Sequence, residues 1–141
     1  MSVSIVQFKS SLENGWLYCR VLSFLKTAYY NDVLVAKPTY KNPSIELVAI
    51  EENKVVGLLD IEIENQPKEV CSSATIRSGM IHHIAVHPEH QRKNIGQKLL
   101  KKAEEQLKDY SVHRLEAWTR DDQWVRECVG FEKILNKITS F

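Results

Sequence analysis

One stretch of the sequence, residues 81–97, combines residue types that suit the binding of a phosphate group. In it an apolar strand runs into a polar segment, and an amphipathic helix follows. The first N–H groups of a helix lack intrahelical partners and carry partial positive charge, so a helix start can hold an anion. Gly96 has no side chain and lets a ligand approach the backbone closely. The nearby basic residues are Arg92, Lys93 and Lys98. The pattern predicts an anion site; the alternative is an ordinary turn with a solvated basic rim.

The same stretch differs from two common phosphate-binding motifs. It lacks the Gly-Lys-Ser/Thr of a Walker loop and the Gly-x-Gly-x-x-Gly of a dinucleotide fingerprint. A third reading is a nucleic-acid-binding module on residues 92–108, which are rich in lysine. Glu104, Glu105 and Asp109 interrupt the basic residues there. Mixed signs are typical of a solvated helix face, so this reading is disfavoured.

The elements on either side of the loop follow from the apolar periods. Residues 75–86 predict a long strand that Pro88 ends. Strand alternation puts Met80, His82, Ile84 and Val86 on one face, and Ile81, His83 and Ala85 on the other. After the loop, helical spacing predicts an amphipathic helix of about four turns. Its apolar positions are Ile95, Leu99, Leu100, Ala103 and Leu107.

The rest of the chain supplies further strands and helices. We expect a strand at 3–8, a helical region from 10 to about 30, a hairpin of 45–50 and 55–64, a strand at 112–118, a short helix near 121–129, and strands at 132–135 and 138–141. The second hairpin strand alternates apolar residues with Asp60, Glu62 and Glu64, so one face carries three carboxylates. The alternative interpretation of these carboxylates is an ordinary solvent-exposed strand face. Hairpins mixed with crossovers predict an α/β (or α+β) domain around a mixed sheet.

The bulk composition restricts the class of protein. The chain has 141 residues, which suits one domain, and its net charge of +1 provides no global attraction for nucleic acid or an anionic membrane. No apolar run approaches the length of a membrane span, and the N-terminus does not read as a signal peptide. The three cysteines, Cys19, Cys71 and Cys128, are widely spaced and odd in number. We therefore expect no disulfide framework, no metal site and a cytoplasmic location.

The strand and loop together resemble motif A of the GNAT superfamily of N-acetyltransferases. In that motif an apolar-x-Val-x-Pro strand end precedes Gln/Arg-x-x-Gly-x-Gly/Ala and a helix. The matching residues here are Ile84-Ala85-Val86-His87-Pro88 and Gln91-Arg92-Lys93-Asn94-Ile95-Gly96. The element order also fits over most of the chain, and Gly130-Phe131 stands where such enzymes usually have Gly-Phe. Asn94 replaces the first motif glycine, and we expect it to tolerate a left-handed backbone.

The resemblance implies a fold and a co-substrate. The fold is one GNAT domain over residues 1–141, with a mixed, mostly antiparallel sheet flanked by helices and splayed between the fourth and fifth strands. Acetyl-CoA would lie in that opening. The resemblance assigns its contacts to Ile84, Ala85 and Val86 on the strand and to Gln91, Arg92, Lys93, Asn94, Ile95, Gly96 and Gln97 in the loop.

The resemblance also implies a reaction, the direct attack of a primary amine on the thioester. An amine is protonated at neutral pH, so a group must take up its proton. The fourth strand often supplies that base in the family, which makes His83 the first candidate and Glu62 the alternative. Many members place a tyrosine acid four residues before the late glycine, and Arg126 stands there. A catalytically weak or inactive acyl-CoA-binding or regulatory protein on the same scaffold is therefore the alternative function.

The partner of this chemistry is a small-molecule or peptide amine. The sequence does not reveal which amine, because acceptor specificity in this fold depends on the first helices and their loops. We expect no nucleic acid and no membrane as partners. A homodimer is left open.

Overall fold

The computed structural model describes residues 2–24 and 34–117. The strands and longer helices of this part are β1 (Ser4–Gln7), α1 (Glu13–Phe24), β2 (Ser44–Glu51), β3 (Lys54–Ile63), β4 (Gly79–Val86), α2 (Ile95–Leu107) and β5 (Leu115–Ala117). Short 3-10 turns occur at Ser10–Leu12, Pro88–His90 and Lys108–Tyr110. The expected end of the first helix, the short helix near 121–129 and the two final strands lie outside the described residues.

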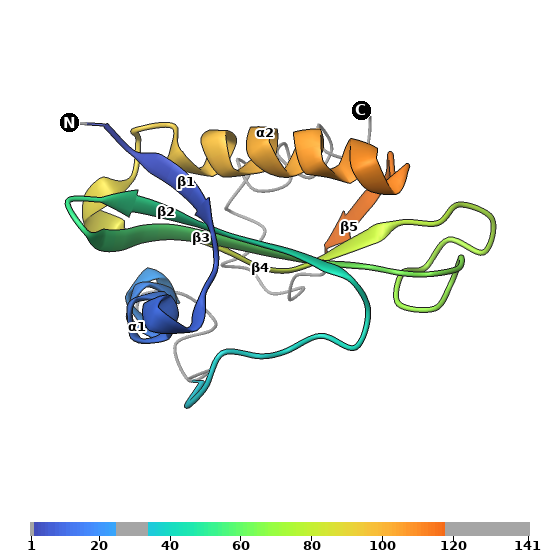
Figure 1. The fold of residues 1–141 in the computed structure, drawn as a ribbon, viewed down its shortest axis with the longest axis horizontal. Coiled ribbons are helices and arrows are strands. Elements are labelled where there is room, and N and C mark those ends of the chain that lie inside the picture. Colours follow the sequence, from blue (N-terminus) through green and yellow to red (C-terminus); the bar gives the residue numbers. More distant parts are fainter. Residues whose placement is uncertain (1, 25–33, 118–141) are drawn as a thin grey trace, which may run out of the picture.

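The described strands form one sheet in the order β1-β2-β3-β4-β5. Neighbouring strands are antiparallel except β4 and β5, which run parallel. Figure 1 shows α2 along one face of the sheet and α1 on the other. The predicted fold class, a mixed and mostly antiparallel sheet flanked by helices, is confirmed.

The described contact between the fourth and fifth strands is short. On β4 the pairing with β5 covers only Gly79 to Ile81. Beyond Ile81, no described residue pairs with β4 on that side, although β4 continues to Val86. Within the described residues, the β4 edge from His82 to Val86 therefore has no strand partner on the side of β5.

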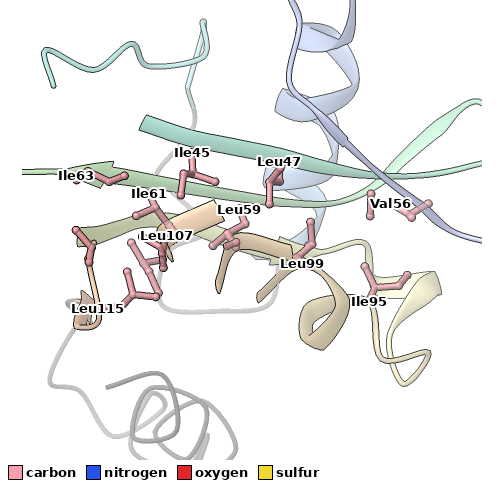
Figure 2. Packing of buried hydrophobic residues seen from close by; sticks show 14 residues of the cluster. Ile45, Leu47, Val56, Leu59, Ile61, Ile63, Ile95, Leu99, Leu107 and Leu115 are labelled. Carbon is pink, nitrogen blue, oxygen red and sulfur yellow. The ribbon is translucent and has the colours of Figure 1, made fainter. Parts of the chain in front are cut away.

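The core between α2 and the sheet fixes where the helix lies. Ile95, Leu99, Ala103 and Leu107 are each 2% exposed or less, and they recur at the predicted helical spacing. Figure 2 shows the α2 side chains meeting those of β2 and β3. Gly57 on β3 allows this close approach, because a Cβ there would lie 2.8 Å from Cγ2 of Ile95. Packing of the first helical turn thus anchors the loop that precedes it.

The core on the opposite face is smaller and gives way to polar residues. Trp16 and Cys19 of α1 are fully buried against Val48, Leu58 and Ala85. Farther along β3, the same face carries the three carboxylates that the alternation predicted.

These carboxylates are buried, so the reading of a solvated strand face is wrong. Asp60 and Glu64 are 0% exposed and Glu62 is 9% exposed. Segment 34–43 runs along this side of the sheet, the side of α1 (Figure 1), and it supplies partners to Asp60 and Glu62. The sequence pattern of β3 alone does not reveal this cover, because irregular segments have no hydrophobic period.

Glu64 explains why β4 begins at Gly79 and not at residue 75 as predicted. Its carboxylate accepts the N–H groups of Val70, Cys71 and Ser78 at 3.0, 2.9 and 2.8 Å. Arg77 Nε also donates to the Glu64 carbonyl oxygen at 2.9 Å. The chain before Gly79 therefore folds around one buried carboxylate instead of extending the strand.

A bulge in β4 overturns the predicted faces of its two histidines. The register shifts between Asp60 and Ile61 of β3, so that His83 lies opposite Asp60 and Ile81 lies opposite Ile61. His82 is the extra residue, and its side chain reaches Glu62 while that of His83 reaches Trp16. Both histidines thus face the side of α1. A bulge adds one residue to a strand and interrupts its alternation.

Candidate active site

The loop before α2 has the backbone geometry of an anion-binding concavity. Arg92 and Asn94 adopt left-handed φ angles of 66° and 62°. Left-handed residues within a turn direct successive N–H groups toward a common point, where an anion can bind. No described residue accepts a hydrogen bond from the backbone N–H groups of residues 91–97. The expectation that Asn94 would take a left-handed backbone is confirmed.

Gly96 has no conformational or packing need to be glycine. Its φ is negative, as in any helical residue, since none of the described glycines has a positive φ. A Cβ built on it would meet only Cγ2 of Val86, at 3.9 Å, which is ordinary contact. The free space over this residue lies at the start of α2, where a helix favours an anion. The room is therefore suited to a ligand that approaches the backbone.

The cations around the loop are not equivalent. Lys93 Nζ lies 3.6 Å from Glu51 Oε2, and His90 Nδ1 lies 2.8 Å from the same oxygen. Burial raises the pKa of Glu51, but Lys93 and His90 outweigh it and hold that pKa below its ordinary value. Within the described part, Arg92 and Lys98 have no ion-pair partner. Their charges are thus available to a ligand, while Lys93 ties the loop to the end of β2.

The open edge of β4 presents backbone groups beside the loop. His87 N–H donates to the Val56 carbonyl of β3 at 2.8 Å, so by strand alternation Val86 and Ile84 turn their backbone groups away from β3. The Val86 carbonyl already accepts the Ser23 hydroxyl at 2.9 Å and the Gln91 amide at 3.4 Å. Ala85 instead packs its side chain against α1. Among the described residues, the backbone groups on this edge without a hydrogen-bond partner are those of Ile84 and the N–H of Val86.

Glu62 and His82 form a hydrogen-bonded pair on the side of α1. His82 Nε2 lies 2.8 Å from Glu62 Oε1, and Glu62 Oε2 accepts the N–H and side-chain amide of Asn42 at 3.3 and 3.1 Å. The His82 ring stacks on Tyr40 with centroids 5.1 Å apart, and one third of its side chain is exposed. When the Glu62 carboxylate accepts a hydrogen bond from Nε2–H, the lone pair of the neutral ring lies on Nδ1 and can take up a proton.

His83 lies in a different environment. Arg20 Nε lies 3.3 Å from His83 Nδ1, and because the guanidinium can only donate, that nitrogen accepts. The edge of Trp16 meets the His83 ring at a centroid distance of 5.2 Å. The structure therefore pairs Glu62 with His82, while His83 is in contact with Arg20.

Sequence reasoning missed His82 and Tyr40 as members of this polar cluster, and it missed Lys37, whose ammonium donates to Asp60 at 2.7 Å beside it. The signal for His82 was its position next to His83, but a strict strand period assigned it to the wrong face. Lys37 and Tyr40 lie in an irregular segment without a hydrophobic period. The one available signal was that a lysine and a tyrosine can donate hydrogen bonds to the carboxylates of β3.

Two further surveys concern the described residues only. Across 2–24 and 34–117, no three or more His, Cys, Asp or Glu side chains gather in a way that would hold a metal ion. In the same ranges no helix is long and apolar enough to cross a membrane.

Comparisons with known proteins agree with this geometry. The acetyltransferase (GNAT) family pattern matches residues 14–127. No curated protein gave a significant sequence match.

Solved structures similar to the chain include three N-acetyltransferases. PaiA N-acetyltransferase from Thermoplasma acidophilum, in complex with coenzyme A, has 14% identity and a TM-score of 0.68, and the match covers 97% of this chain and 89% of that one. An aminoglycoside acetyltransferase from an uncultured soil metagenomic sample has 17% identity, a TM-score of 0.70 and coverages of 100% and 93%. Ribosomal-protein-alanine N-acetyltransferase from Brucella melitensis has 17% identity, a TM-score of 0.65 and the same coverages. At these identities the likeness concerns the fold.

Proposed function

We propose that this chain, which belongs to the acetyltransferase (GNAT) family, transfers an acetyl group from acetyl-CoA to a primary amine. The observation that carries this proposal is the loop 91–97. There, backbone N–H groups without described acceptors, two left-handed residues and the open space over Gly96 converge beside the free edge of β4. The coenzyme A bound to the Thermoplasma acidophilum structure supports the same co-substrate.

In this proposal the loop holds the pyrophosphate of acetyl-CoA. The backbone N–H groups of residues 92–97 donate to its oxygens, and Arg92 and Lys98 add charge without first breaking an ion pair. The pantetheine runs along the open edge of β4 and bonds the backbone of Ile84 and Val86. The side chain of Gln91 contributes indirectly, since it ties the loop to the Val86 carbonyl.

The amine nitrogen attacks the thioester carbonyl, the C–N bond forms, and the C–S bond breaks with the thiolate as leaving group. We assign the uptake of the amine proton to His82, through Nδ1, with Glu62 orienting the ring through Nε2. This replaces His83 as first candidate. The lone pair of the neutral His83 ring lies on Nδ1, which already accepts a hydrogen bond from Arg20 Nε. The thiolate takes a proton from solvent, and protonated His82 releases one to solvent, which completes the proton balance.

The test combines binding with turnover. Calorimetry with acetyl-CoA on the wild type and on Gly96→Trp asks whether binding is tight and whether a bulky side chain at the loop abolishes it. Release of free thiol, followed with a panel of primary amines, then asks whether the bound thioester is used. Absence of binding in both proteins would refute the proposal. Binding without amine-dependent thiol release would favour the alternative of an acyl-CoA-binding protein without catalysis.

A further inference from the structure

A buried lysine occupies an enclosed site beside the Glu62–His82 pair. The Lys37 side chain is only 3% exposed. Its ammonium donates to Asp60 Oδ2 at 2.7 Å and forms an ion pair with Glu46. It also lies 4.6, 5.1 and 5.3 Å from the ring centroids of Phe8, Trp16 and Tyr40. We call these two carboxylates and three rings the ammonium cage.

The composition of the cage is that of a receptor for an alkylammonium ion. Aromatic faces attract a cation through their quadrupole, and this attraction grows when water is excluded. Carboxylates supply the compensating charge that a buried ammonium requires. An uncharged guest would leave the negative charges of Asp60 and Glu46 uncompensated. A branched or cyclic amine would need more room than one linear lysine side chain fills.

Three walls of the cage lie on regular elements, while Phe8 and Tyr40 lie on irregular segments, and Tyr40 shares segment 34–43 with the present occupant. Trp16 lies on α1, Glu46 on β2 and Asp60 on β3, which are regular elements packed in the core. Lys37 arrives on the irregular segment 34–43 and is held there by its own N–H, which donates to Glu13 Oε2 at 3.0 Å. The two carboxylates and Trp16 are therefore placed by the sheet and α1, while segment 34–43 brings both the guest and the Tyr40 ring.

The cage also holds polar atoms that Lys37 leaves unused. Asp60 is 0% exposed, yet its Oδ1 has no hydrogen-bond partner among the described residues, and neither has Nε1 of the fully buried Trp16. A buried acceptor without a partner costs free energy, so its presence points to a further donor. An ammonium carried by another chain can be placed so that one of its N–H groups reaches Oδ1, which the Lys37 ammonium does not.

Burial raises the pKa of Asp60, and the hydrogen bonds from Lys37 and Tyr40 oppose that rise. Burial, followed by the charge of Asp60, raises the pKa of Tyr40, which keeps its hydroxyl protonated as a donor to Asp60 at 2.5 Å. A cation in the cage is thus what allows Asp60 to be charged. An ammonium has three N–H donors and no free lone pair, so the group held in the cage is not the nucleophile.

We propose that the ammonium cage binds an unbranched alkylammonium group of the acceptor, and that Lys37 is a resident guest that exchanges with it. The Tyr40 ring lies within 5.3 Å of both the cage ammonium and the His82 ring centroid. An acceptor anchored in the cage can therefore extend past Tyr40 and present a second amino group to His82. The acceptor class is an amine with two amino groups on a linear chain; this last step rests on the proposed function.

The first experiment tests the cage without acetyl-CoA. Lys37→Ala removes a propylammonium-sized part of the side chain, so we expect n-propylammonium to bind and to raise the melting temperature of the variant. At ten times Kd the expected rise is about 5 °C. 1-Propanol has the same chain and no charge, and it should have no effect. The wild type should respond to n-propylammonium much less than Lys37→Ala, because Lys37 competes for the cage, and Lys37→Ala/Asp60→Asn should not respond to either compound. A folded Lys37→Ala protein that ignores n-propylammonium would overturn the proposal.

A second experiment uses the wild type and keeps the proposal testable should Lys37→Ala fail to fold. The kcat/KM for 1,5-diaminopentane is compared with that for 5-amino-1-pentanol, which replaces one ammonium by a hydroxyl. We expect at least a tenfold preference for the diamine, and its loss in Asp60→Asn. A lysine-containing peptide with a free N-terminus, compared with its norleucine counterpart, shows whether the alkylammonium belongs to a small molecule or to a peptide.

The outcomes separate the two proposals. Equal kcat/KM for the diamine and the amino alcohol, and for the two peptides, would refute the cage as acceptor site and leave the acetyltransferase proposal intact. Stabilisation of Lys37→Ala by n-propylammonium in a protein that does not bind acetyl-CoA would support the cage and refute the acetyltransferase proposal.

Discussion

Replacing Gly96 by alanine separates ligand binding from folding stability. The added Cβ lies 3.9 Å from Val86 Cγ2 and meets nothing closer, so the free protein accepts it without strain. Alanine is favoured over glycine in a helix by up to about 1 kcal/mol. We therefore expect the free energy of unfolding to stay equal or to rise by that amount. Urea denaturation measures it.

The same Cβ occupies the space through which a phosphate would approach the backbone. Loss of one hydrogen bond from an N–H to a charged oxygen costs about 1.5–3 kcal/mol. Since about 1.4 kcal/mol is a factor of ten, the acetyl-CoA dissociation constant should rise roughly 10- to 100-fold. Calorimetry on the two proteins under the same salt concentration gives this ratio.

Gly57→Ala is the matched control, because it changes the same residue type and affects the same helix from beneath. Its Cβ would lie 2.8 Å from Ile95 Cγ2 and 3.1 Å from Leu99 Cδ1. Overpacking of this kind costs about 1–3 kcal/mol of stability. The reasoning about Gly96 would be refuted by acetyl-CoA affinity within twofold of the wild type, or by a loss of stability like that of Gly57→Ala.

Three further changes test other parts of the structure. His82→Gln should lower kcat about 100-fold or more while acetyl-CoA affinity stays unchanged, and wild-type turnover in the variant would remove His82 from the reaction. Glu64→Gln should cost about 1.5–3 kcal/mol of unfolding free energy, because the carboxylate accepts three backbone N–H groups. Burial raises the pKa of Glu64, but hydrogen bonds from the N–H groups of Cys71, Val70 and Ser78 outweigh burial and hold this pKa below its usual 4.5. Its contribution is therefore present above about pH 4.5 and lost as pH falls through the lower folded value, and an acid denaturation series should show this loss in the wild type but not in the variant. Burial is the main reason that the thiol pKa is raised to about 11 for Cys19 and to about 12 for Cys71. Peptide mapping after iodoacetamide treatment at pH 8 should find both unmodified until the protein unfolds.

The regular elements were predictable because their core positions repeat. The helix Ile95–Leu107 and the antiparallel pair β2 and β3 follow directly from apolar periods of 3.6 and 2. The left-handed Asn94 was predictable as well, since asparagine tolerates that backbone.

The candidate site was harder, because its features break those periods. The extra residue at His82 shifts one side chain to the other face, and nothing in the alternation of β4 marks it. The carboxylates of β3 read as a solvated face because the cover over them, with Lys37, lies in an irregular segment. The ion pair between Lys93 and Glu51 joins residues 42 positions apart, which only the folded sheet brings together.

The most direct test of the central claim is an amide NMR titration of the wild type with acetyl-CoA. Each backbone N–H reports its own hydrogen-bond partner, so the site is located residue by residue. The proposal predicts that the largest shifts belong to residues 92–97, followed by Ile84 and Val86 on the open edge of β4. Saturable binding that moves other amides and leaves residues 92–97 in place would contradict it.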